Sequence, residues 1–313
     1  MKLFALILST QERLATTDID NPVLDARLLI AHALGCDRAA LLMQGERVLG
    51  DDEIKNIDAL ISRRASREPV HRILGCREFW GLPFGLNEAT LEPRPDSETL
   101  IEVALSSFRR KPESSAARLR GTRLFCTADA VQLDPAFQRD DERVKSLRLL
   151  DLGTGTGCLL LSLLHEWPTA TGVGIDKAPR AAQQAALNAQ RLGLDDRAVF
   201  RIGDWLDGVE EKFDLILCNP PYIPSHDMDG LQPEVRLHDP AAALDGGTDG
   251  LDPYRHLIPL LPQFLNANGV VLFEVGIGQA QDVATMMEKA SFKNVTITND
   301  LGDIPRCVSG SAS

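Results

Sequence analysis

The sequence predicts an α/β protein in which a small all-helical N-terminal domain precedes a Rossmann-like, open doubly wound sheet. From Leu3 to about Arg67, apolar residues recur at helical spacing. After Ser146, strand-like and helix-like runs alternate, which is typical of parallel strands joined by crossover helices. A glycine-rich turn, Gly153–Gly157, follows the first of these strands, so we expect a ligand at the carboxyl ends of the strands.

The helical domain is expected to span residues 1–74. Leu24, Leu28 and Leu29 fall on one side of a predicted helix. Asn21-Pro22 before them is a helix start signal, and Gly35 after them is a stop signal. Short helices of this kind must pack on one another to bury their apolar stripes, so they predict a compact helical unit.

A β-hairpin linker is expected over residues 75–92, where aromatic residues, glycines and a proline replace the helical pattern. The domain boundary is placed near Thr90, and residues 93–313 form the larger domain. Within it, residues 110–146 are rich in Arg, Ser, Ala and Asp and predict a surface insertion that is partly flexible. Only Leu124–Val131 is apolar enough there to be ordered.

In the larger domain, strand-like and helix-like runs alternate along the sequence. The expected strands are Leu147–Leu152, Gly172–Asp176, Ala198–Ile202, Phe213–Asn219, Val270–Val275 and Val295–Asn299. The expected helices are Cys158–Trp167, Ala178–Leu192, Tyr254–Leu265 and Ala280–Ala290. This order predicts a doubly wound parallel sheet.

Composition argues against several classes of function. The formal net charge of −12 opposes broad attraction to nucleic-acid phosphates. No apolar run approaches the ~18 to 20 residues that a membrane-spanning helix requires, and Leu3–Leu8 lacks the length and cleavage site of a signal peptide. The cysteines form no C-x-x-C pair and the histidines do not cluster with them, so no metal site is predicted. We expect a cytoplasmic protein.

The glycine turn predicts a nucleotide-type ligand. Gly153, Gly155 and Gly157 let the backbone approach a ligand, and Thr154 and Thr156 lie between them at the start of a helix with free N–H groups. Asp176 ends the next strand, where a carboxylate can accept hydrogen bonds from both ribose hydroxyls. Each feature alone has a structural explanation, as a tight turn or a solvated acid. NAD and S-adenosylmethionine both satisfy this pattern.

Asp204 and Trp205 follow the third strand. There, an acid and an aromatic ring can hydrogen-bond and cover an adenine. Alternatively, Trp205 is a rim residue that packs the edge of the sheet.

The segment Asn219-Pro220-Pro221-Tyr222 follows directly after an apolar strand. It is the feature that distinguishes S-adenosylmethionine from NAD as the expected ligand. The prolines alone could serve to end a strand, but that leaves the flanking Asn and Tyr unexplained. An amide nitrogen is a poor nucleophile, and two acceptors aimed at its N–H bonds hold it and enrich its electron density. The Asn219 side-chain oxygen and the Pro220 carbonyl can supply them. Tyr222 can pack over the amide plane, and positioning in line with a methyl sulfonium supplies much of the rate.

The sequence closely resembles the HemK/PrmC family of peptide chain release factor glutamine methyltransferases. Besides the glycine turn, Gly203–Trp205 and Asn219–Tyr222, the matching segments are Glu68–Gly75, Arg77–Phe84, Pro93–Glu98, Pro233–Val235, Leu244–Leu251 and Asp300–Arg306. The resemblance covers nearly the whole chain except about residues 110–146. Asn-Pro-Pro-Tyr alone is less specific, since adenine methyltransferases of nucleic acid share it.

This resemblance implies transfer of a methyl group from S-adenosylmethionine to the glutamine amide in the Gly-Gly-Gln motif of class I release factors, with S-adenosylhomocysteine as product and no metal. It implies a helical domain that helps to recognise the release factor. It implies that the glycine turn, Asp176, Trp205 and Asn219 contact the cofactor, while Asn219, Pro220, Pro221 and Tyr222 hold the glutamine. Asp204 is our further cofactor candidate.

Two departures from the family pattern stand out: the long insertion, and Glu92 where an apolar residue is usual. A ribosomal-protein glutamine or an adenine amino group in nucleic acid remains an alternative substrate. The second would need a basic face, for which Arg63, Arg64, Arg67 and Arg72 are the evident candidates. We expect no direct nucleic-acid binding. A nicotinamide-dependent dehydrogenase would leave Asn219–Tyr222 without a purpose, and an intact site disfavours a purely binding module.

Overall fold

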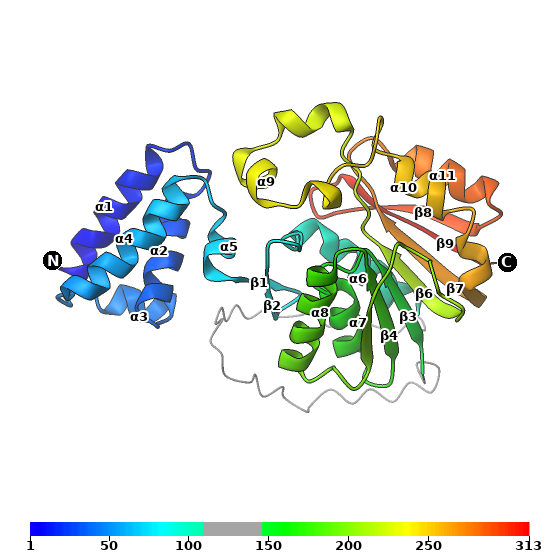
Figure 1. Ribbon diagram of the computed structural model, residues 1–313, viewed down its shortest axis with the longest axis horizontal. Coiled ribbons are helices and arrows are strands. Elements are labelled where there is room, and N and C mark those ends of the chain that lie inside the picture. Colours follow the sequence, from blue (N-terminus) through cyan, green and yellow to red (C-terminus); the bar gives the residue numbers. More distant parts are fainter. Residues whose placement is uncertain (109–145, 313) are drawn as a thin grey trace.

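The computed structural model describes residues 1–108 and 146–312. The predicted insertion at 110–146, with its Leu124–Val131 run, lies outside the described residues except for Ser146. In Figure 1 the helical part lies at one end of the molecule, the hairpin follows it, and the α/β part forms the other end. The α/β architecture with a helical N-terminal part is therefore confirmed.

The N-terminal part consists of α1 (Leu3–Ala15), α2 (Pro22–Ala33), α3 (Arg38–Met43), α4 (Asp51–Ala65) and α5 (Val70–Leu74). The Asn21 side chain accepts a hydrogen bond from the Leu24 backbone N–H, and Pro22 lies in the first turn of α2, as predicted. The buried faces of these helices form one apolar core. The amphipathic spacing of the sequence is thus satisfied by helix-on-helix packing.

Strands β1 (Cys76–Phe79) and β2 (Leu82–Gly85) form the predicted antiparallel hairpin. Trp80 and Gly81 make its turn, and both have a positive φ (54° and 76°), which suits the twist of a two-residue hairpin. The Gly85 backbone N–H donates to the Asn188 side-chain oxygen (2.9 Å), and the Asn188 amide donates back to the Gly85 carbonyl (3.1 Å). The hairpin is therefore fixed to α8 (Pro179–Leu192).

The α/β part contains one sheet with the order β5-β4-β3-β6-β7-β9-β8. Its strands are β3 (Arg148–Leu152), β4 (Thr171–Asp176), β5 (Ala198–Ile202), β6 (Phe213–Cys218), β7 (Leu265–Glu274), β8 (Lys293–Asn299) and β9 (Pro305–Ser311). Strands β3 to β7 pair in parallel, as predicted. Their carboxyl ends therefore meet at one edge of the sheet.

Helices cover both faces of this sheet. One apolar core joins α6 (Glu98–Ser107), α7 (Cys158–Glu166) and the hairpin to the sheet, and a second joins α10 (Asp252–Leu257) and α11 (Ala280–Lys289) to it. Within β3, Leu149 belongs to the first core and Leu150 to the second, because successive side chains of a strand point to opposite faces.

One strand of the sheet was not predicted from the sequence, and this strand is antiparallel. Residues Pro305–Ser311, which the sequence pattern does not mark as a strand, form β9 antiparallel to both β7 and β8. Only Cys307 and Val308 give this segment apolar character among Ser and Gly residues, so periodicity is too weak to detect it. Pairing with a strand on each side, together with burial of Cys307 and Val308 in the two cores, stabilises β9.

The predicted helix Tyr254–Leu265 extended too far towards the C-terminus. The structure has α10, then a 3-10 turn at Leu261–Phe264, and β7 begins at Leu265. Pro259 and Pro262 lack the backbone N–H that a continuing helix needs, so the helix ends early.

Between β6 and α10 the chain forms the 3-10 turn η2 (Ser225–Gly230), α9 (Pro233–His238) and the 3-10 turn η3 (Ala241–Ala243). Throughout residues 1–108 and 146–312, no helix is both long and apolar enough to cross a membrane.

Candidate active site

A cavity of about 470 Å³ opens at the carboxyl ends of β3, β4, β5 and β6. This is the edge where a doubly wound sheet binds its ligands. Of the predicted site residues, its wall includes Gly153, Thr154, Gly155, Thr156, Asp176, Asp204, Trp205, Asn219 and Pro221. Segments that are far apart in sequence thus share one cavity.

The glycine turn lies between β3 and α7. Gly153 and Gly155 have φ of 71° and 55°, a conformation that side chains with a Cβ rarely adopt. The backbone N–H groups of Gly153 and Thr154 donate to the Ile175 carbonyl, which fixes the turn to β4. Gly157 does not line the cavity. It precedes α7, and a Cβ there would come within 3.3 Å of three side chains, so its position is explained by packing.

The Asp176 carboxylate is held at the end of β4 by two backbone N–H groups. Gly155 donates to its Oδ2 and Ala178 to its Oδ1, each at 2.9 Å. Burial raises the pKa of this carboxyl, against the lowering effect of the two N–H donors. Each oxygen keeps a further lone pair, so the carboxylate is oriented and able to accept two hydroxyl donors.

Asp204 and Trp205 follow β5 and line the same cavity. The Asp204 Oδ2 accepts from the Lys177 Nζ at 2.7 Å, so this acid is already paired near the surface. A Cβ placed on Gly153 would be 3.6 Å from the Trp205 ring, which shows that the ring packs beside the glycine turn. Trp205 therefore forms a flat apolar wall of the cavity.

Asn219 and Pro221 line the cavity, whereas Pro220 is buried behind them and Tyr222 lies outside the lining. The Asn219 Nδ2 donates to the Ser97 Oγ at 3.3 Å. The Tyr222 hydroxyl lies 3.4 Å from the Glu274 Oε1, and burial raises the pKa of this tyrosine. The segment thus brings its amide side chain, but not its aromatic ring, to the cavity.

A glycine-rich loop at 244–251 supports this segment from behind. The Ile223 N–H donates to the Leu244 carbonyl, and the Gly246 N–H donates back to the Ile223 carbonyl. A Cβ on Gly250 would lie 2.2 Å from the Tyr222 carbonyl oxygen. The loop can therefore approach the backbone this closely only with glycine.

Sequence reasoning gave no role to several polar residues around Asn219. Ser97, which belongs to the matching segment Pro93–Glu98, lines the cavity. Glu274 is buried at the end of β7, and burial raises its pKa to about 7. Asp151 is buried too, accepts from the Thr154 hydroxyl at 2.6 Å, and has its pKa raised by burial to about 7. An acid ending an apolar strand was the signal that identified Asp176, and the same signal could have identified Glu274.

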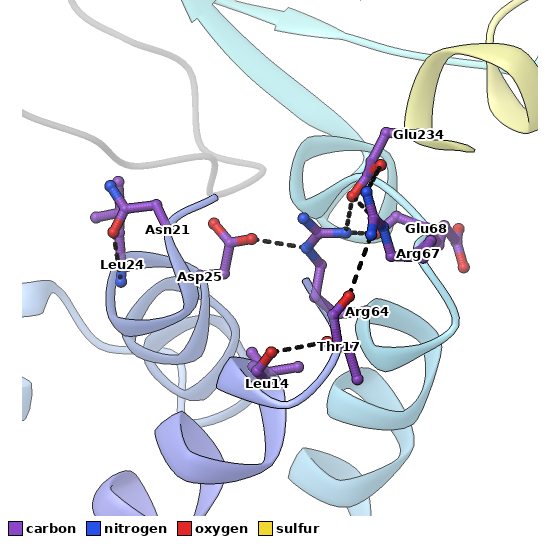
Figure 2. Close-up of polar contacts among 9 residues, drawn as sticks. All are labelled: Leu14, Thr17, Asn21, Leu24, Asp25, Arg64, Arg67, Glu68 and Glu234. Atoms are coloured by element: carbon purple, nitrogen blue, oxygen red, sulfur yellow. Dashed lines mark hydrogen bonds and ion pairs between the residues drawn. The ribbon is translucent and has the colours of Figure 1, made fainter. Parts of the chain in front are cut away.

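The arginines that could have formed a basic face are paired with carboxylates. Arg63 pairs with Glu68, Arg64 with Asp25 and Glu234, Arg67 with Glu234, and Arg72 with Asp239. Figure 2 shows Arg64 and Arg67 converging on Glu234, which belongs to α9 of the α/β part. Arg64, Arg67 and Arg72 thus join the two parts of the molecule. All four arginines are paired with acids and offer little free charge to a phosphate backbone.

Glu92, which replaces an apolar residue of the family pattern, is paired as well. It is buried in the cavity wall, where its carboxylate forms an ion pair with Arg77 of β1. The departure is therefore balanced by a neighbouring positive charge.

Both parts of the chain are similar to known protein families. Residues 5–75 match the PrmC N-terminal domain, and residues 143–304 match a methyltransferase domain. Release factor glutamine methyltransferase of Rhodospirillum rubrum is 44% identical over 296 residues, which span 95% of this chain and 81% of that protein. The Bradyrhizobium diazoefficiens protein of the same name is 42% identical over 298 residues, spanning 95% and 90%.

Among solved structures, the hMettl16 catalytic domain, determined with the MAT2A 3′UTR hairpin 6, is similar with a TM-score of 0.56. The similarity spans 78% of this chain and 81% of that chain. The sequence identity is 14%, so this likeness shows a shared fold only.

Proposed function

Because this chain belongs to the release factor glutamine methyltransferase family, we propose that it methylates the side-chain amide nitrogen of the glutamine in the Gly-Gly-Gln motif of class I release factors. The methyl donor is S-adenosylmethionine and the product S-adenosylhomocysteine. The observation that carries the proposal is the position of Asn219, which lines the same cavity as the glycine turn and Asp176.

The residues of the cavity fit the donor. Asp176 is oriented to accept hydrogen bonds from two ribose hydroxyls, and the Trp205 ring offers a flat surface for adenine. Gly153 and Gly155 leave room for close approach to the backbone. We propose that these residues, with Thr154, Thr156 and the more peripheral Asp204, bind the donor. Bound there, S-adenosylmethionine supplies an electrophilic methyl group.

The chain itself positions the nucleophile. We propose that the Asn219 Oδ1 and the Pro220 carbonyl accept the two N–H bonds of the substrate amide, while Pro221 fixes the backbone and Tyr222 packs behind it. Holding the NH2 group in this way directs its electrons at the methyl carbon, and the orientation accounts for much of the rate enhancement. The methylated amide then loses a proton readily, so no strong general base is required.

We further propose that residues 1–74 recognise the release factor, that the hairpin at 75–92 links them to the catalytic residues 93–313, and that the enzyme acts in the cytoplasm. Methylation of an adenine in nucleic acid is disfavoured, because Arg63, Arg64, Arg67 and Arg72 are paired with acids. We therefore expect no direct binding of nucleic acid.

Incubation with labelled S-adenosylmethionine and purified release factor, ribosomal proteins or DNA tests the proposal. Mass spectrometry should locate the label on the Gly-Gly-Gln glutamine. Label on a ribosomal-protein glutamine or on a base, with none on the release factor, would refute it.

The variant Asn219→Ala should lower kcat by at least ~100-fold, since one of two acceptors on the reacting nitrogen is lost. Asn219 is only partly buried, so the thermal midpoint should change little. Undiminished turnover by a folded variant would show that the acceptor is a different group.

A further inference from the structure

We propose that Ser97 and Glu274 are positioning residues that set the polarity of the Asn219 carboxamide, so that its oxygen and not its NH2 group faces the substrate amide. The inference rests on the proposed role of Asn219 and adds two residues to the site. With the opposite polarity, the Asn219 NH2 group would face the NH2 group of the substrate amide. Two donors cannot form a hydrogen bond, so the substrate nitrogen would not be held.

The three side chains come from separate elements. Ser97 ends the 3-10 turn η1 (Pro95–Ser97), Glu274 ends β7, and Asn219 follows β6, the parallel neighbour of β7. The Asn219 Nδ2 donates to the Ser97 Oγ at 3.3 Å, and a side-chain hydrogen bond from Ser97 favours the ionised form of Glu274. Ser97 and Glu274 are 3% and 1% exposed, so both groups that follow Asn219 in this chain of hydrogen bonds are buried.

The direction of the chain of hydrogen bonds follows from counting protons. An ionised carboxylate only accepts, so the single hydroxyl proton of Ser97 goes to Glu274. The Ser97 oxygen then has only lone pairs to offer Asn219, and only the Nδ2 side of the carboxamide can donate to them. The Asn219 Oδ1 is thereby directed away from Ser97 and left to accept from the substrate.

Glu274 is costly to the fold, which argues for a role beyond packing. Among the described residues, its Oε2 has no hydrogen-bond partner although the atom is buried. Its Oε1 lies 3.4 Å from the Tyr222 hydroxyl. Glu274 therefore contacts Tyr222 directly, and it is linked to Asn219 through Ser97.

Protonation of Glu274 should disrupt this arrangement. Burial raises its pKa to about 7, opposed by Ser97, Arg306 and Tyr222 and assisted by Asp96. The other titratable groups around it are Tyr254, Cys158, Cys218 and Cys307, each of which burial keeps neutral. A protonated Glu274 can donate to Ser97, which frees the Ser97 hydroxyl to donate to the Asn219 oxygen and stabilises the inverted carboxamide. Turnover should therefore fall as the pH drops below about 7.

The test compares kcat, KM and pH profiles for the full chain with purified release factor. Ser97→Ala and Glu274→Gln should each lower kcat roughly 10- to 100-fold, with little change in KM or in S-adenosylmethionine affinity. Ser97→Thr keeps the hydroxyl and should restore most of the rate. Ser162→Ala, which removes a buried α7 hydroxyl that has no partner among the described residues, is the matched control and should behave as wild type.

The pH profile separates positioning from simple damage. Asp151 also has a pKa of about 7, so the decisive comparison is between variants: Glu274→Gln should remove the decline of kcat below about pH 7 that wild type and Ser162→Ala show. Wild-type kcat in folded Ser97→Ala and Glu274→Gln, or an unchanged acid limb in Glu274→Gln, overturns the inference. If Asn219→Ala is also fully active, the proposed site itself fails; if Asn219→Ala alone is inactive, only the positioning role fails.

Discussion

Among the carboxylates that line the cavity, Asp176 is the one whose two oxygens are held by backbone N–H groups. Its two oxygens are aligned by the Gly155 and Ala178 N–H groups, so they are prepared to accept hydroxyl hydrogen bonds without reorganisation. Asp176→Ala should weaken binding of S-adenosylmethionine by at least ~10-fold, the equivalent of one charge-assisted hydrogen bond. Calorimetric titration measures this. Asp204→Ala is the comparison, because Asp204 is already paired with Lys177 at the surface, and equal losses in both variants would contradict the assignment.

We expect Glu274 to lower the stability of the fold while it supports activity. Its folded-state pKa is raised to about 7 from an ordinary 4.5, so the folded state binds a proton that the unfolded state has released between these values. The fold is therefore relatively favoured at low pH, and this contribution is lost as the pH rises through 4.5 to 7. At pH 8 the buried charge costs up to ~3 kcal/mol. Glu274→Gln should raise the thermal midpoint at pH 8 and much less at pH 5; calorimetry at both pH values checks this, and a lower midpoint at pH 8 would contradict it.

At the level of elements, the loop 244–251 supports the Asn219–Tyr222 segment by close backbone contact. Gly250 has φ of 76°, and a Cβ there would lie 2.2 Å from the Tyr222 carbonyl oxygen. Gly250→Ala must therefore displace this segment, and we expect kcat to fall at least ~10-fold with a loss of ~1–3 kcal/mol in stability. The control is Gly230→Ala, because a Cβ on Gly230 would meet no atom within 4 Å and its φ is not positive. Equal activity of the two variants would show that the loop does not position the site.

The sequence predicts elements well where one local signal is enough. The glycine turn, the hairpin and the parallel strands β3 to β7 each have such a signal, in residue type or in periodicity. β9 does not, since its two apolar residues are too few to mark a strand and its pairing with two neighbouring strands is a tertiary contact. Ser97 is similar: it is an ordinary serine in sequence, and only the fold brings it to Asn219, which lies 122 positions further along the chain. Tertiary contacts of this kind cannot be deduced from local pattern.

At the scale of the whole molecule, ion pairs connect the helical part to the segment that leads into the cavity wall. Arg64 and Arg67 of the helical part bind Glu234 on α9, and Arg72 binds Asp239 just beyond it. The chain continues from there into Pro240, Ala242 and Ala243, which line the cavity. One short segment, residues 234–243, thus connects the helical part to the cavity wall.

Breaking this connection should loosen the two parts without unfolding either. The side chains of Arg67 and Glu234 are only 21% and 16% exposed, so their pairing is less screened than a surface pair, and a double-mutant cycle with Arg67→Ala and Glu234→Ala should give a coupling of ~1–2 kcal/mol in stability. Glu234→Ala should also raise KM for the release factor, since the proposed recognition domain is no longer held in place. Glu46→Ala, which removes the exposed pair with Lys2, should change neither quantity. A coupling near zero together with an unchanged KM would mean that the helical part is held by its apolar and backbone contacts alone.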